Sequence, residues 1–214
     1  MIETSRGLVL RTRPLTESSL IIHWLTPQLG RLATVAKGAR RAKSSFQGKL
    51  DLGYLLDFSF VRSRRSDLHT LREVSLREAH PALRRDIGYL QQLAYCTALI
   101  ELATETETPL SGIYDLLCRL LQHLPAGPPQ CLTVFAFELK LLQELGLAPD
   151  LERTHLKPGT KQWLHQLTTA DWPFLAQLRP SPAQINELRQ YLHGFVIFHL
   201  GKIPAGRGPA LQLT

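Results

Sequence analysis

The sequence predicts an α+β fold in which a small five-stranded barrel precedes an α-helical domain. Residues 1–80 contain short runs of β-branched and aromatic residues separated by turn residues, whereas the hydrophobic period changes to 3.6 after Pro81. The charge divides at the same point. Residues 1–80 hold 14 Lys and Arg against 7 Asp and Glu, and residues 81–214 hold 11 against 11. We therefore expect two domains, residues 1–80 and 81–214.

The first domain is expected to contain five strands. They are predicted at residues 7–13, 19–26, 31–38, 54–62 and 68–75. Pro27 and Gly30 bound the turn after the second strand, with the proline early and the glycine last, as a type I turn prefers. A longer connection, residues 39–50, follows the third strand, where a barrel of the OB type places an extra turn or helix. The predicted domain is therefore an OB fold.

The second domain is expected to be helical. Apolar residues recur at helical spacing over residues 84–104, 108–124, 131–146 and 182–200. Thr108 and Pro109 are predicted to open the second of these helices, and Ser181 to cap the last one through a capping box with Gln184. Residues 150–175 are the least regular part, and we predict a loop-rich insertion there, with a short helix at about residues 171–178.

The stretch VAKGARRAKSS (35–45) concentrates positive charge, and no acidic residue occurs from residue 18 to residue 50. A solvated surface usually mixes both signs, so this imbalance favours a surface that neutralises a nucleic-acid backbone. Arg31 and Lys37 are an even number of residues apart and should share one face of a strand. The candidate DNA-binding residues are Arg31, Lys37, Arg40, Arg41, Lys43, Lys49, Arg64 and Arg65.

The basic domain is also compatible with other functions, which its residues support to different degrees. Lys43-Ser44 matches the end of a phosphate-binding loop, but that motif requires glycine at the positions of Lys37 and Ala42. Four aromatic residues could stack on bases, although most of them suit the core of the barrel better, namely Phe46, Tyr54, Phe58 and Phe60. An RNA-binding or ribosome-associated OB protein would have the same barrel and charge. A metal-dependent nuclease would use three acidic residues, Asp51, Asp57 and Glu73.

The sequence contains no signature of catalysis or of metal binding. Its three cysteines form no CxxC pair, and His193 and His199 are six residues apart on one predicted helix, which does not suit a shared metal ion. We expect a protein that is not an enzyme, with no catalytic residue, no metal and no cofactor. Charged residues near the N-terminus and the lack of a long apolar run predict a soluble, cytoplasmic protein with no membrane partner. Binding to DNA would make it nucleoid-associated.

Three segments together resemble the RecO family of bacterial recombination mediators. They are GLVLRTRPLTESSLIIHWLTPQLGRLATVAKGARRAKSSFQGKLD (7–51), FELKLLQELGLAPDLE (137–152) and the tail GKIPAG (201–206). The resemblance implies an OB fold followed by a helical domain, binding of single- and double-stranded DNA, and annealing of complementary strands in the RecFOR pathway. It also implies cooperation with RecR to load RecA onto strands coated by single-strand binding protein.

Within the resemblance, the helical domain receives the acidic, apolar-ended tail of the single-strand binding protein (SSB). Charge alone suggests Arg119, Lys140 and Arg153 as the residues that contact this tail. The chain departs from the family in one respect, because many members carry two CxxC-type pairs just after the APDLE segment and bind zinc there. This sequence has no cysteine beyond Cys131. We expect packing to hold the insertion instead, around Trp163, Leu164, Trp172 and Phe174.

Overall fold

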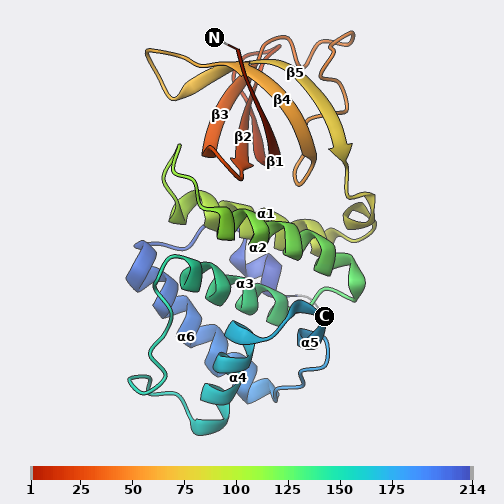
Figure 1. Cartoon of the computed structure of the whole chain (residues 1–214). Coiled ribbons are helices and arrows are strands. Elements are labelled where there is room, and N and C mark those ends of the chain that lie inside the picture. The colour runs from red at the N-terminus through yellow and green to blue at the C-terminus, as the bar shows by residue number, and fades with distance from the viewer. Residues whose placement is uncertain (1, 213–214) are drawn as a thin grey trace. The chain divides into compact units, whose positions relative to one another are not determined.

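The structure is a computed structural model that describes residues 2–212, and it confirms the predicted α+β fold (Figure 1). The chain forms two compact units. The first contains the described residues up to Ala82 together with Thr104–Asp115, and the second contains Leu83–Ala103 and the residues from Leu116 onward. The assignment of residues 104–115 to the first unit was not expected from the sequence.

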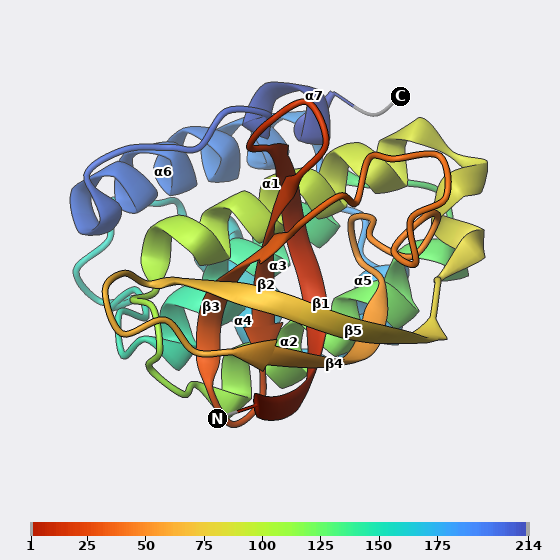
Figure 2. The same cartoon turned by 90° about the horizontal axis from the view of Figure 1, so that it is seen from above.

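Five strands in the first unit form a closed barrel. They are β1 (Ile2–Pro14), β2 (Leu20–Thr26), β3 (Gly30–Ala36), β4 (Leu55–Val61) and β5 (Leu68–Glu78). Their order around the barrel is β1-β2-β3-β5-β4, with β4 pairing back to β1; the β3–β5 pair is parallel and the other pairs are antiparallel (Figure 2). This arrangement agrees with the predicted OB-type barrel.

Aromatic rings fill the interior of the barrel. Trp24 stacks on Phe58 with ring centroids 4.1 Å apart, and Phe60 continues the row toward His69. The indole N–H of Trp24 donates to the hydroxyl of Thr34 at 2.8 Å, so the one polar atom of this ring is satisfied inside the core. In β4, Phe58 and Phe60 alternate with half-buried residues, as the period of a β-strand requires.

Seven helices are described in the remainder of residues 2–212. They are α1 (Ile87–Ala103), α2 (Ser111–His123), α3 (Cys131–Glu144), α4 (Pro158–Thr169), α5 (Trp172–Leu175), α6 (Pro182–Leu200) and α7 (Arg207–Leu211). Helix α3 is buried along most of its length and is the central element of the second unit. Two short 3₁₀ turns, Pro81–Arg85 and Leu124–Ala126, precede α1 and follow α2.

The ends of two helices test the predicted caps. The capping box at α6 is confirmed, because the Ser181 hydroxyl accepts from the backbone N–H of Gln184 and the Gln184 side chain accepts from the backbone N–H of Ser181. The predicted start of α2 at Thr108 is wrong. The helix begins at Ser111, because residues 104–110 follow the barrel instead of the helical period.

The insertion at residues 150–175 is more helical than predicted, since α4 occupies its centre. Leu164 and Trp172 are buried as expected, whereas Phe174 is 43% exposed and does not serve the core. Lys140 links α3 to the end of α4 through hydrogen bonds that the sequence did not predict; we call this contact the Lys140 clasp. Its ammonium donates to the carbonyl oxygens of Thr168 and Ala170, at 2.9 and 2.7 Å, and so holds the end of α4 against α3.

A helix that spans a lipid bilayer must be both long and predominantly apolar. Within residues 2–212, no helix combines the length and the apolar character that spanning a bilayer would require.

Candidate nucleic-acid interface

Six exposed cations gather on β1 and on the end of β3 with the connection that follows it. We call them the basic face, and they are Arg11, Arg13, Lys37, Arg40, Arg41 and Lys43. Arg11 and Arg13 were not among the residues predicted from the sequence. Their alternation with Leu10 and Thr12 in the first predicted strand was the available signal.

Strand register brings the two parts of the basic face together. Arg13 of β1 lies opposite Ile21 of β2, which in turn lies opposite Val35 of β3. Lys37 follows two residues after Val35 and therefore continues the same outer face. A bulge between Val9 and Arg11 sets this register, because it shifts the strand so that the arginines point outward while the core residues before them point inward.

The connection after β3 is a series of tight turns without a helix. Phe46 anchors it, since this side chain is only 8% exposed and packs into the barrel core. The backbone N–H of Arg40 donates to the carbonyl of Ser18 at 3.0 Å, and the Arg40 guanidinium donates to the carbonyl of Thr16 at 3.2 Å. The connection is thus fixed to the loop between β1 and β2, and its cations are held at one end of the barrel.

The other four predicted DNA-binding residues are not part of the basic face. Arg31 shares the outer face of β3 as predicted, but it is half-buried and donates to the Thr104 hydroxyl at 2.7 Å and to the Thr104 carbonyl. Lys49 is half-buried. Arg64 and Arg65 are exposed in the loop that leads into β5. Because β5 begins beside Ala33, in the middle of β3, and runs parallel to it, this loop precedes the paired residues and lies away from Lys37. The structure therefore groups four of the eight predicted residues.

The candidate stacking residues are mostly part of the core. Phe46, Phe58 and Phe60 are at most 8% exposed, and Tyr54 is half-buried against the same core. The outer surface of β2 and β3 presents aliphatic side chains beside the cations, including Ile21 and Val35. The basic face is therefore suited to contact with phosphates and offers no aromatic ring of these four for stacking on a base.

The acidic residues considered for a nuclease do not form a metal site. Asp57 accepts hydrogen bonds from Arg6 at 2.9 Å and from Arg77, and these two guanidiniums lower the pKa of its carboxyl group. Asp57 and Glu73 line the same shallow depression, which does not include Asp51. Among residues 2–212, no three His, Cys, Asp or Glu side chains are grouped to hold a metal ion. The nuclease interpretation therefore has no geometric support.

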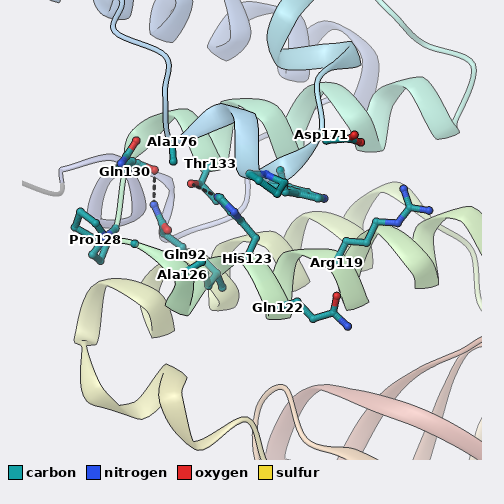
Figure 3. A pocket seen from close by; sticks show the side chains of 15 residues that line it. Gln92, Arg119, Gln122, His123, Ala126, Pro128, Gln130, Thr133, Asp171 and Ala176 are labelled. Atoms are coloured by element: carbon teal, nitrogen blue, oxygen red, sulfur yellow. Dashed lines mark hydrogen bonds between the residues drawn. The ribbon is translucent and has the colours of Figure 1, made fainter.

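A cavity of about 590 Å³ opens in the second unit (Figure 3). Helix α2 contributes Arg119 and His123, α5 contributes Trp172, and the loop before α3 contributes prolines and Gln130. The ring centroids of His123 and Trp172 are 5.1 Å apart, and burial lowers the pKa of the His123 imidazole. The cavity thus combines a largely apolar lining with a single guanidinium and the exposed carboxylate of Asp171.

The three cations suggested as contacts for an acidic tail do not lie together. Arg119 is exposed and lines this cavity. Lys140 lies 5.9 Å from the Trp172 ring centroid, but its ammonium is already bonded to two carbonyl oxygens, and burial lowers its pKa. Arg153 pairs with Asp150 at 3.2 Å and lines a different groove, beside α6.

Comparison with known proteins matches both units. The family model described as "Recombination protein O N terminal" matches residues 1–80, and the one described as "Recombination protein O C terminal" matches residues 84–156.

Individual relatives agree with these matches. The chain is 28% identical to the DNA repair protein RecO of Bacillus pumilus over 212 residues, which is 95% of this chain and 81% of the relative. It is 34% identical over 146 residues to the protein of the same name from Anaeromyxobacter sp. strain K, and 32% identical over 151 residues to that of Exiguobacterium sibiricum. These alignments cover 68% and 71% of this chain, and the chain spans 58% and 60% of the two relatives' lengths.

Proposed function

Since the chain belongs to the RecO family of DNA repair proteins, we propose that it serves DNA repair and recombination by binding DNA backbones, without catalysing a reaction. The observation that carries this proposal is the basic face, where six exposed cations lie on one end of the barrel. Residues 1–80 would be the DNA-binding domain, and the protein would act in the cytoplasm at the nucleoid.

Contacts with phosphates explain how such a face would bind both single and double strands. Lysine and arginine neutralise phosphates and release condensed counterions, a term that does not depend on base sequence. Because Phe58 and Phe60 are buried, the bases of a bound strand would stay free to pair. Two strands whose charges are screened and whose bases are exposed can anneal, which is the activity we propose for this surface.

The helical unit would supply the contacts with other proteins. We propose that it receives the tail of SSB, and that the protein then works with RecR to load RecA onto the coated strand. The cavity at α2 suits such a tail, because its apolar lining would accept the apolar end and the Arg119 guanidinium would pair with a carboxylate. Of the three suggested cations, Arg119 has the most favourable position.

Charge reversal at Arg119 tests the tail site. The variant Arg119→Glu is expected to bind a fluorescent peptide with the sequence of the SSB tail at least about ten-fold more weakly than the parent, because one charge-assisted hydrogen bond becomes a repulsion. Arg153→Glu is the matched control, since Arg153 lines another groove. Equal affinities of Arg119→Glu and the parent for the peptide would show that the tail does not bind at this cavity.

A salt titration tests DNA binding itself. If the six cations of the basic face each neutralise one phosphate of a single strand, the logarithm of the binding constant should fall with the logarithm of salt concentration with a slope of about −4. Fluorescence anisotropy with unrelated oligonucleotide sequences should give the same slope for each. A slope near zero would exclude backbone binding, and preference for structured RNA over DNA in competition would favour the RNA-binding alternative.

A further inference from the structure

Residues 104–110, between α1 and α2, cover part of the outer surface of the barrel. We call them the covering segment. The backbone N–H of Glu107 donates to the carbonyl of Arg31 at 2.7 Å, and Thr106 forms a parallel bridge with the same residue. The Arg31 side chain donates to the hydroxyl and to the carbonyl of Thr104. The segment therefore pairs with the start of β3 along its edge, and Thr104 holds the side chain of Arg31.

The carboxylate of Glu107 lies where a barrel cation and an imidazole converge. His69 Nε2 is 2.8 Å from one carboxylate oxygen, and Arg62 donates through Nη1 to the same oxygen. The backbone N–H of Ser63 donates to His69 Nδ1 at 3.3 Å, so Nε2 carries the hydrogen that Glu107 accepts. Glu3 holds the other edge of the Arg62 guanidinium, at 2.8 and 3.0 Å. The His69 and Arg62 donors thus converge on one oxygen atom of Glu107.

The local backbone is shaped to hold this carboxylate in place. Glu107 has φ of +55°, in the left-handed region that residues other than glycine rarely adopt. Gly30, at the start of β3, has φ of +66°, and a Cβ atom there would lie 2.2 Å from the carbonyl oxygen of Thr108. Only glycine therefore lets the covering segment approach β3 this closely. The hydrogen bond from His69 lowers the pKa of Glu107, so the group is an anion at neutral pH.

We propose that Arg31, Arg62 and His69 form a further phosphate subsite for DNA, and that Glu107 occupies it as a stand-in when no DNA is bound. A phosphodiester carries one negative charge and presents acceptor oxygens, as the carboxylate does, so it can accept from Arg62 Nη1 and His69 Nε2 in place of Glu107. This inference rests on the proposed binding of DNA backbones.

Displacement of the covering segment would lengthen the DNA path. Arg31 would be released toward the outer face of β3 that it shares with Lys37. Arg64 and Arg65 follow Arg62 after Ser63 in the chain and are exposed. The basic face would then continue along β3 to the loop before β5. In the closed state, which the structure shows, the covering segment holds the Arg31 side chain away from this path.

The test compares two neighbouring glutamates. Glu107→Gln removes the competing charge and should bind single-stranded DNA about three- to ten-fold more tightly at 0.1 M salt, with a salt slope steeper by about one. Glu105→Gln is the matched control, because it changes net charge equally on the same segment, and Glu105 is exposed and forms no ion pair within the described residues. The double variant Glu107→Gln/Arg62→Ala should lose the gain. Equal affinities of Glu107→Gln and Glu105→Gln would overturn the proposal.

Hydrogen exchange on the parent protein supplies a second measurement that needs no variant. The amide of Glu107, which is bonded to Arg31 in the closed state, should exchange faster when DNA is saturating, because the segment leaves β3. Slower exchange at this amide would show that the segment stays, and would reject the subsite. If the parent itself binds no DNA, the proposed function fails, and that result is distinct from unchanged exchange in a protein that does bind.

Discussion

Reversal of four charges on the basic face should abolish DNA binding while leaving the fold intact. The variant carries Lys37, Arg40, Arg41 and Lys43 all replaced by Glu. Each lost phosphate contact costs about 0.7 logarithmic units of affinity for a single strand at 0.1 M salt, so four contacts account for about 600-fold, before the repulsion from four new carboxylates is added. Anisotropy with a labelled single strand measures the loss.

The positions of these residues explain why the fold should survive. Lys37, Arg41 and Lys43 are exposed, and the barrel core is closed beneath them by Phe46. Arg40 makes one side-chain hydrogen bond, to the Thr16 carbonyl at 3.2 Å. The far-UV circular dichroism and the melting temperature should therefore change little.

A second quadruple variant controls for net charge. Its four cations lie outside the basic face and are also changed to Glu: Arg72, Lys157, Lys161 and Lys202. It should keep most of the DNA affinity, because general repulsion at a distance is screened beyond a Debye length of about 8 Å at physiological salt. If both variants lose affinity equally, binding depends on total charge and the basic face is not the site.

Local patterns in the sequence were sufficient for most of the fold. Period-two runs located all five strands, and the change of period located α1, α3 and α6. Helix α4 was missed because PGTKQWLHQLTT begins with proline and glycine and has few apolar residues. Its stability comes from buried Leu164 and Leu167 and from the clasp by Lys140, a residue of another helix. A contact of that kind leaves no local signal.

The candidate site was predicted in part for a similar reason. The cations after β3 were recognisable because they are consecutive in the chain and no acid lies among them. Arg31 belongs to the same strand face, but its hydrogen bonds go to Thr104, 73 residues further on. Arg11 and Arg13 reach the basic face only through the register of β1 with β2. The positions of Arg11, Arg13 and Arg31 are set by contacts with residues far away in the sequence. Such contacts cannot be predicted from the segment that contains the residue.

The interior of the helical unit gives the largest expected effect on stability. Glu138 of α3 is fully buried, and Arg207 of α7 donates to both of its oxygens, at 2.6 and 3.0 Å. The hydroxyl of Tyr95, from α1, donates to Glu138 at 2.6 Å. The carboxylate therefore joins three helices, and both Arg207 and Tyr95 use it as a hydrogen-bond acceptor. It also links FELKLLQELGLAPDLE, one of the three segments that resemble the family, to Arg207, which directly follows another of them, GKIPAG.

Removal of one partner should leave an unpaired charge in the core. Arg207→Met is expected to destabilise the protein by about 3–5 kcal/mol, because the Glu138 carboxylate would then be buried with only the Tyr95 hydroxyl as a partner. Glu138→Gln should cost a similar amount through the unpaired guanidinium. Urea unfolding followed by circular dichroism measures both free energies, and a loss below about 1 kcal/mol for either variant would contradict the role assigned to the pair.

The double variant separates the charge effect from the packing effect. In Glu138→Met/Arg207→Met both charges are gone, and a buried ion pair replaced by apolar side chains of similar volume is often close to neutral in stability. The double variant should therefore be more stable than either single variant, with the remaining loss due to the unpaired hydroxyl of Tyr95, which Tyr95→Phe should recover. Additive losses in the double variant would show that the two side chains act by packing alone. A loss in the double variant that is smaller than the sum of the two single losses would show that the ion pair between Glu138 and Arg207 fixes α7 to the core of the helical unit.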